Sequence, residues 1–206
     1  DALAFRLGNR LLGNETDAAG LELTVAGPTL RFNSDTVIAL TGAAMSAELD
    51  GAPLAMWQAV KVSAGSILRL GSVQGGGCRA YLAVAGGFEV PDYLGSKSTF
   101  TLGEFGGHAG RTLRVGDVLH FHGGASSAGE TLDPALLPEY GNNWEIGVLY
   151  GPHGAPDFFT EADIEMFVST EWEVHDNSSR TGVRLIGPKH QWARTDAGEA
   201  GQHPSN

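Results

Sequence analysis

Glycine placement constrains the fold of this chain more than any other feature of its sequence. The 206 residues include 30 glycines, which fall singly or in pairs between short apolar runs. Glycine adopts turn conformations that other residues avoid, so this spacing is typical of many tight turns, and the β-branched runs between the turns favour strands. We therefore predict a mainly β fold with a closed or nearly closed antiparallel sheet. The expected strands are Leu21–Ala26, Thr29–Phe32, Thr36–Leu40, Ala55–Val62, Ile67–Val73, Arg79–Ala85 and Leu113–His122.

A short helix is predicted before the first strand. Asp1 can act as its N-cap, because Leu3, Leu7 and Leu11 then recur at helical spacing along one face. Gly13 is placed to end this helix.

A change in composition divides the chain into two parts. Residues 1–125 hold the strands named above, 126–143 form a linker that begins within a Gly/Ala/Ser-rich stretch, and 144–206 form a second unit. The second unit should contain a helix that Thr160 caps, with Asp163 completing a capping box. Because about 60 residues are too few for a self-sufficient barrel, we expect this unit to be incomplete. Its expected strands are Glu171–His175 and Thr181–Ile186.

Charge and cysteine content exclude several classes of function. The chain has 13 Lys and Arg against 24 Asp and Glu, a net charge of −11 that would repel a phosphate backbone or an anionic membrane surface. We therefore expect neither nucleic acid nor a membrane as a partner. Cys78 is the one cysteine, so no internal disulfide can form. With no apolar run near the roughly 20 residues that span a bilayer and no signal-peptide layout, a cytoplasmic location is expected.

Three local patterns suggest chemistry, but each has a plainer interpretation. His120 and His122 would share one face of a strand, as in a cupin-like metal site, yet further ligands at suitable spacing are missing, so no metal is expected. The segment Gly71–Gly77 looks like a phosphate loop, but the Lys and helix that such a loop needs do not follow, which favours a hairpin loop. Cys78 begins an apolar strand, where a buried, inert thiol is expected.

Polar loop residues supply the candidate binding groups. Ser96 and Ser98 flank Lys97, and their hydroxyls can either bond their own turn or contact a ligand. Arg180 and Arg184 bracket the start of a strand in an acidic chain. Their planar guanidinium groups can bind a carboxylate or carbonyl, or form solvated salt bridges.

Groups suited to acid–base chemistry occur nearby in the sequence. They are His153, Asp157, Glu199 and His203. Taken singly, each of these is more often a turn residue or a surface charge.

Five sequence blocks together resemble one family of carboxyltransferases. The blocks are Arg79–Gly87, Leu94–Phe100, GPHGAPDFFTEADIEMF from Gly151, RTGVRLIGPK from Arg180 and GEAGQHPSN from Gly198. They are similar to the subunit 2 half of the allophanate hydrolase-like carboxyltransferases, which include the KipA proteins and the C subunit of 5-oxoprolinase. The last three blocks look most like the carboxyltransferase region of the urea carboxylases. The resemblance covers nearly the whole chain.

The resemblance implies both a fold and an activity. The fold would be two cyclophilin-like β-barrel subdomains with a few short helices, the first lacking its N-terminal part and the second incomplete. The activity would be transfer of the carboxyl group of carboxybiotin to urea, which gives allophanate. Biotin would be carried on a separate carrier domain and ATP used by a separate biotin carboxylase domain, with a subunit 1-like half as a further partner. The fragment alone is expected to be inactive.

The resemblance also suggests roles for individual residues. Arg180 and Arg184 would stabilise charge that develops during transfer, and Asp157 or Glu199 would act as the base. Residues expected to bind substrate are Ser179, Thr181, His203, Asn206, Ser96 and Ser98. Two alternatives stay open: the C subunit of a 5-oxoprolinase, acting without biotin, and a non-catalytic, KipA-like regulatory or ligand-binding barrel.

Overall fold

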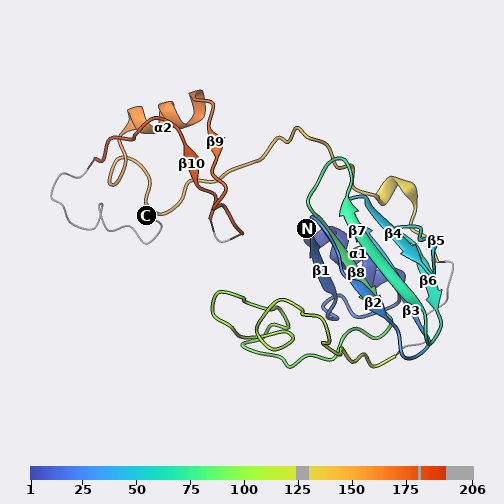
Figure 1. Cartoon of the computed structure of the whole chain (residues 1–206). Helices are drawn as coiled ribbons and strands as arrows, with labels where there is room; N and C mark the ends of the chain where they lie inside the picture. The colour runs from blue at the N-terminus through green and yellow to red at the C-terminus, as the bar shows by residue number, and fades with distance from the viewer. Residues whose placement is uncertain (124–129, 181, 194–206) are drawn as a thin grey trace. The chain divides into compact units, whose positions relative to one another are not determined.

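The polypeptide forms two compact units, residues 1–144 and residues 145–206 (Figure 1). The computed structural model describes residues 1–123, 130–180 and 182–193. Each unit is described by itself below.

Unit 1 contains two four-stranded sheets. One sheet has the order β1 (Leu21–Thr24), β8 (Arg79–Val84), β3 (Thr36–Gly42) and β6 (Ala59–Val62). The other has the order β2 (Thr29–Arg31), β7 (Ile67–Val73), β4 (Met45–Leu49) and β5 (Ala52–Pro53). Every strand pair in both sheets is antiparallel. The predicted mainly β, antiparallel fold is confirmed, but the two sheets are not closed into one continuous barrel.

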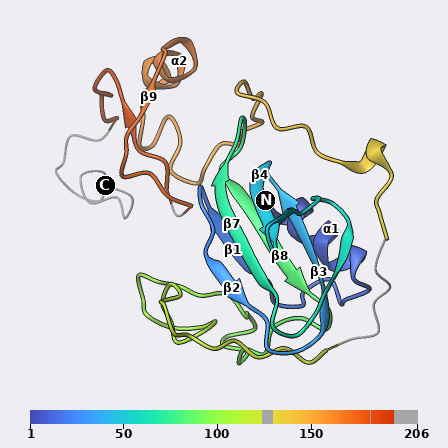
Figure 2. The same cartoon turned by 45° about the vertical axis from the view of Figure 1, so that its right-hand side comes forward.

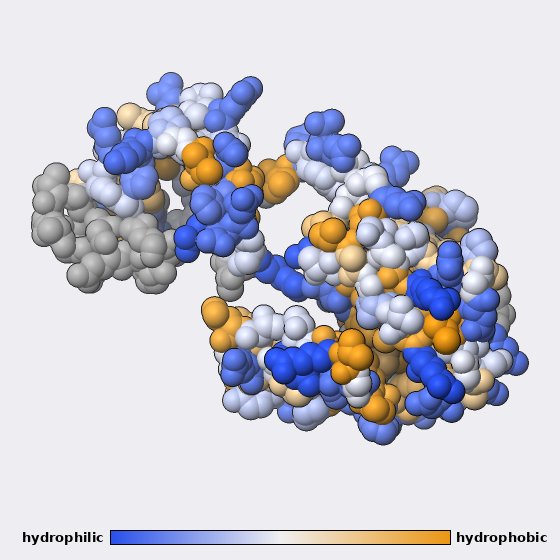
Figure 3. Space-filling model, viewed as in Figure 1, coloured by the Kyte–Doolittle hydropathy of each residue, from blue (hydrophilic) through white to orange (hydrophobic). Residues whose placement is uncertain are grey.

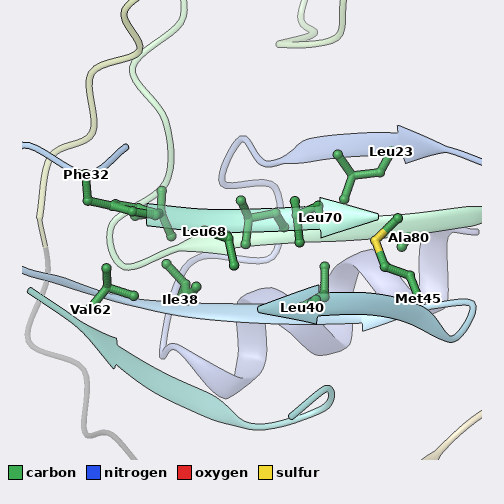
Figure 4. Close-up of a cluster of buried hydrophobic side chains, with 12 residues drawn as sticks. Leu23, Phe32, Ile38, Leu40, Met45, Val62, Leu68, Leu70 and Ala80 are labelled. Atoms are coloured by element: carbon green, nitrogen blue, oxygen red, sulfur yellow. The ribbon is translucent and has the colours of Figure 1, made fainter. Parts of the chain in front are cut away.

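The main hydrophobic core lies between these two sheets. Ile38 and Leu40 of β3 face Leu68 and Leu70 of β7, and all four side chains are buried (Figure 4). Burying each such side chain contributes about 1.5–3 kcal/mol. The core therefore fixes the position of both sheets.

Helix α1 (Ala2–Leu11) covers the other face of the sheet that contains β3 and β8 (Figure 2). A second buried cluster joins Leu11 and Leu12 to small side chains such as Ala39 and Ala83. Because β3 is covered on both faces, all seven of its residues are buried. As predicted, Asp1 caps the helix, and its Oδ1 accepts a hydrogen bond from the Ala4 N–H at 3.0 Å.

Two strand predictions for unit 1 need correction. Leu113–His122 is not a strand, because Gly116 takes a left-handed conformation (φ +95°) within this stretch and only Phe121 makes a single bridge, to Phe88. Residues Ala55–Gln58 are not strand either, and β6 starts at Ala59. β4 and β5 were not among the predicted strands. Ala and Glu have low strand propensity, but packing of Met45 and Ala47 into the core outweighs it.

The connection from β7 to β8 differs from its prediction as well. Gly71–Gly77 was expected to be a hairpin loop, but β7 and β8 belong to different sheets, so this segment crosses between sheets. The adjoining Cys78 is exposed rather than buried, with an Arg79 guanidinium nitrogen 3.1 Å from its sulfur. Its position before β8 rather than within it explains the exposure.

Unit 2 contains helix α2 (Glu161–Ser169) and a two-stranded antiparallel sheet of β9 (Glu173–Val174) and β10 (Leu185–Ile186). The predicted capping box is confirmed: Thr160 and Asp163 exchange hydrogen bonds at the start of α2. Both strands are shorter than predicted. Among the described residues of this unit, Asp163 alone is buried. The chain also has a 3-10 turn in unit 1, η1 (Pro134–Leu136).

Apolar residues reach the surface in both units, as the orange atoms of Figure 3 show. Within the described part of the chain, neither α-helix has the length and apolar character needed to cross a membrane.

Candidate functional site

Ser96 and Ser98 lie on a long loop of unit 1 that follows β8. The Ser96 hydroxyl donates to the Ser98 hydroxyl at 3.1 Å and accepts from the Ser98 N–H at 3.1 Å. The Ser96 side chain therefore shapes its own turn. Both serines are exposed and also line a cavity, so their hydroxyls remain accessible to a ligand.

Aromatic side chains hold this loop together. The Phe105 ring lies 4.9 Å from the Tyr93 ring and 5.2 Å from the Phe100 ring, centroid to centroid. Gly106 follows with φ +74°, and a Cβ at that position would overlap the carbonyl oxygen of Ser98. The backbone on which Ser98 stands is thus packed directly against Gly106.

An ion pair closes the base of the same loop. Both Arg111 terminal nitrogens donate to the Asp117 carboxylate, each at 2.8 Å, and the Arg114 N–H donates to it at 2.7 Å. The His108 imidazole lies 3.8 Å from the same carboxylate. The guanidinium of Arg111, followed by the Arg114 N–H, lowers the pKa of Asp117 far below its usual range. In the folded protein near neutral pH, this carboxylate is therefore ionised.

Two adjoining cavities lie beside the loop. The smaller has a volume of about 270 Å³, and the larger, about 350 Å³. Asp17, Ala19 and Lys97 line both. The smaller cavity is also lined by Phe5, Gly20, Asp92, Gly95, Ser96 and Ser98. It therefore brings serine hydroxyls together with charged groups of both signs.

Two asparagine side chains fix the wall of these cavities that carries Asp17. Asn9 is fully buried, and its amide donates to the Ala18 carbonyl at 2.9 Å. The Asn14 amide donates to the Asn9 side chain at 3.0 Å and to the Val84 carbonyl at 2.8 Å, and it accepts from the Gly86 N–H at 2.8 Å. These bonds tie the segment that carries Asp17 to the end of β8.

Asp17 and Asp92 line the smaller cavity but were not among the predicted site residues. They are 75 positions apart, and neither belongs to a motif. The position of Lys97 between Ser96 and Ser98 is the one local signal in the sequence for this cavity.

Arg180 stands at the tip of a hairpin in unit 2. The Ser179 N–H donates to the Gly182 carbonyl at 2.9 Å, and the Gly182 N–H donates back at 3.2 Å. Arg180 is the first residue of the turn that these bonds close, and its side chain is exposed. The tight turn thus places Arg180 at the tip of the hairpin.

Arg184 lies on the returning arm of the same hairpin. Its N–H donates to the Ser178 hydroxyl at 3.0 Å, and the Ser178 hydroxyl donates to its carbonyl at 3.3 Å. The His175 N–H also donates to that carbonyl, at 2.9 Å. The Arg184 backbone is therefore fixed while its side chain is exposed.

The segment GPHGAPDFFT packs its aromatic residues within unit 2. The Phe159 ring lies 5.1 Å from the Trp192 ring and 5.5 Å from the His190 ring, and the Ala193 N–H donates to the Phe158 carbonyl at 3.0 Å. Asp157 within this segment is exposed and makes no hydrogen bond or ion pair with another described residue. Much of the segment is structural, with Asp157 left accessible.

The buried carboxylate of Asp163 joins α2 to the segment before Trp192. It accepts hydrogen bonds from the Gln191 N–H and from the N–H and hydroxyl of Thr160. Burial opposes ionisation of this group, but these hydrogen bonds outweigh burial and lower the pKa of Asp163. A charged, fully bonded carboxylate is thus part of the framework of unit 2.

Four further predicted site residues, Thr181, Glu199, His203 and Asn206, lie outside the described residues. The others divide between the units: Ser96 and Ser98 are in unit 1, and Asp157, Ser179, Arg180 and Arg184 are in unit 2.

His120 and His122 make no metal site with other described residues. His122 Nδ1 lies 3.2 Å from a Glu89 carboxylate oxygen, and the His120 carbonyl accepts from the Glu89 N–H at 2.8 Å. Within residues 1–123, 130–180 and 182–193, no group of three potential ligands comes together.

Comparison with known proteins gives consistent matches along the whole chain. Urea amidolyase of Saccharomyces cerevisiae is 47% identical over 213 residues, which cover 100% of this chain but 12% of that protein. The crystal structure of the K. lactis urea amidolyase matches with a TM-score of 0.87 and 47% identity, over 100% of this chain and 13% of that one. The C subunit of 5-oxoprolinase from Escherichia coli is 36% identical over 189 residues, 91% of this chain and 58% of that protein.

This chain thus spans about an eighth of the length of the urea amidolyases it resembles. The sequence profile of one family, the carboxyltransferase domain, subdomains A and B, matches residues 1–206. The match extends through both units and includes the hairpin of Arg180 and the loop of Ser96. The chain therefore belongs to this family of carboxyltransferase domains.

Proposed function

We propose that this chain is part of the carboxyltransferase domain of a biotin-dependent urea carboxylase. That enzyme would transfer a carboxyl group from carboxybiotin to a nitrogen of urea and release allophanate. The observation that carries the proposal is the 47% identity over the whole chain to a urea amidolyase, together with a TM-score of 0.87 to a second one. Because the chain spans a small part of those proteins, the activity belongs to the complete enzyme.

The hairpin arginines are suited to stabilise charge during transfer. When a nitrogen of urea forms its bond to the carboxyl carbon, negative charge concentrates on the carboxyl oxygens. Arg180 at the hairpin tip and Arg184 on its returning arm are exposed, and each presents a planar fork of guanidinium donors. Ser179 and Thr181 adjoin Arg180 in sequence and can orient the substrate, as can His203 and Asn206.

The urea nitrogen must lose a proton as the new bond forms. Asp157 is accessible to a ligand and accepts no hydrogen bond from the described residues, which leaves both carboxylate oxygens able to accept that proton. Glu199 is the second candidate base. A base must lie within hydrogen-bonding reach of the proton it takes.

Biotin, when its carrier domain delivers it, supplies the carboxyl group. The donor set of this chain fits such a group, because guanidinium forks and serine hydroxyls bind carboxylate and ureido oxygens well. Within unit 2, Arg180 and Arg184 would hold it. We infer that ATP is used in a separate biotin carboxylase domain, and that a subunit 1-like half and the carrier domain are the partners of this chain in a cytoplasmic enzyme.

A second candidate is the C subunit of a 5-oxoprolinase, which would act without biotin. The 36% identity to the E. coli protein supports it. The urea amidolyase match is stronger both in identity and in the share of this chain that it covers.

The half-reactions of the complete enzyme test the proposal. We expect Arg184→Ala to lower allophanate formation by about a hundredfold or more, as loss of one preorganised oxyanion donor does. ATP-dependent carboxylation of free biotin should keep its wild-type rate, and a melting curve would show whether the fold is intact. Wild-type enzyme that forms no allophanate from urea, bicarbonate and ATP would refute the proposal.

A further inference from the structure

Two runs of strand pairing in the hairpin of unit 2 are out of register with each other. In the first run, β9 and β10 pair Val174 with Leu185. If that register continued to the tip, Gly182 would face Asn177, but Gly182 pairs with Ser179 instead. The outgoing arm therefore carries two extra residues, and the regular pairing is broken between the β9–β10 ladder and the tip.

The Ser178 hydroxyl bridges this break. It accepts from the Arg184 N–H at 3.0 Å and donates to the Arg184 carbonyl at 3.3 Å. A hydrogen-bonded residue pair in an antiparallel ladder exchanges the same two kinds of bond through its backbones. Among the described residues, this hydroxyl is the one acceptor for the Arg184 N–H. One serine side chain thus takes the place of a backbone partner opposite Arg184.

Ser178 is itself held by the turn that contains the extra residues. Its N–H donates to the His175 carbonyl at 3.0 Å, and the Asn177 N–H donates to His175 Nδ1 at 2.9 Å. Ser178 is partly buried, whereas its neighbours Asn177 and Ser179 are exposed. A fixed turn therefore presents the hydroxyl to the returning arm, and the hydroxyl is less open to competing water than its neighbours are.

We propose that Ser178 is a positioning residue for carboxyl transfer, which acts by fixing the backbone from which the Arg184 guanidinium extends. The Arg184 side chain is exposed, so the reach of its guanidinium depends on where its backbone is held. Small misplacements of a group that takes part in a reaction lower the rate steeply. The role of the guanidinium rests on the proposed function, whereas the two hydrogen bonds of Ser178 rest on the structure alone.

Removal of the hydroxyl in the complete enzyme gives the first test. We expect Ser178→Ala to lower kcat for allophanate formation about tenfold, less than the loss expected when the Arg184 guanidinium itself is removed. Ser178→Thr keeps a hydroxyl and should recover most of the lost rate. ATP-dependent carboxylation of free biotin should not change in either variant. A kcat within twofold of wild type in Ser178→Ala, or Ser178→Thr no faster than Ser178→Ala, overturns the proposal.

Ser169 provides a matched control in the same unit. Its hydroxyl also donates to a backbone carbonyl, that of Glu165 at 2.7 Å, but it lies at the end of α2 and outside the hairpin. Ser169→Ala removes the same atom and the same kind of bond, so its rate of allophanate formation should stay at the wild-type value. A loss equal to that of Ser178→Ala would show that the rate responds to any loosening of unit 2, which would refute the positioning role.

A double-mutant cycle shows whether Ser178 acts through Arg184. In the wild-type background, Ser178→Ala should cost about tenfold in kcat. In the Arg184→Ala background it should cost less than about twofold, because the group that Ser178 positions is already gone. The same tenfold loss in both backgrounds would mean that Ser178 acts independently of Arg184, and the proposal would then be wrong.

Hydrogen exchange separates this inference from the proposed function, because it needs no turnover. In the complete protein, the peptide that contains Arg184 should take up deuterium faster in Ser178→Ala than in wild type, and at the wild-type rate in Ser169→Ala. Unchanged uptake in Ser178→Ala overturns the proposal. Wild-type enzyme that makes no allophanate, together with this faster uptake, would refute the function and support the Ser178 contact. Normal allophanate formation with equal losses in both backgrounds of the cycle would support the function and refute the positioning role.

Discussion

Unit 1 and unit 2 hold their candidate site residues in different ways. In unit 1, the loops that carry Ser96 and Asp17 extend from sheets whose core side chains are buried between them and beneath α1. In unit 2, the hairpin that carries Arg180 is shaped by hydrogen bonds of its own turn, and large apolar residues such as Leu149 are 96% exposed. Function can therefore be supported either by a packed core or by local polar bonds, and the two respond differently to mutation.

The largest effect is expected when a core side chain of unit 1 is shortened, which tests whether the packed core dominates this unit. Leu40 is 1% exposed and lies between the sheets. We expect Leu40→Ala to lower the free energy of unfolding by about 2–5 kcal/mol, because it removes buried contacts and leaves a cavity. Guanidinium unfolding of the 206-residue chain measures this. A loss below 1 kcal/mol would mean that the core does not dominate unit 1.

A smaller loss is expected at the asparagine network. Asn14→Ala leaves the Val84 carbonyl and the Gly86 N–H without their side-chain partner. The free energy of unfolding should fall by about 1–3 kcal/mol. Hydrogen exchange at the Gly86 amide should also speed up, which a change in core packing alone would not cause. An unchanged exchange rate at Gly86 would contradict the network.

Acid should lower the stability of both units, so this test looks for a property that the two units share. Asp117 in unit 1 and Asp163 in unit 2 have lowered pKa values in the folded protein. Their stabilising effect is therefore complete above the unfolded pKa of about 3.9 and is lost as pH falls below it. Asp117→Asn and Asp163→Asn should each differ from wild type in melting temperature at pH 7, and the difference should shrink towards pH 3. A difference independent of pH would show that charge is not involved.

The smallest effect is expected at the surface of unit 2. Val168 on α2 is 74% exposed. Val168→Ala should change the free energy of unfolding by less than about 0.5 kcal/mol in the 206-residue chain. A larger loss, measured by the same unfolding experiment, would mean that this face is covered in solution.

Elements with strong local signals could be predicted from the sequence, and those set by distant contacts could not. The bounds of β7 and the caps of both helices follow from strand composition and from the capping residues Asp1 and Thr160. β4 was not predicted, because its residues have low strand propensity and only their packing in the core stabilises the strand. The expected strand at Leu113–His122 fails because Asp117 draws Arg111 and Arg114 into a turn.

The candidate site shows the same division. The arginine hairpin and the serine loop could be proposed as candidates because each lies within a short run of the sequence. Asp17 and Asp92 lie at the same cavity only because the loop after α1 and the loop after β8 meet in the folded unit. No local pattern could have joined them.

The Asn14 side chain has a consequence for how this domain can change length during evolution. Surface loops usually tolerate inserted residues. Here one amide spans the loop after α1 and the turn after β8, so it sets the length of both at once. An insertion between Asn9 and Asn14, or a deletion at the turn of Gly86, would carry that amide out of reach. Length changes in this family should therefore be rare at these two places.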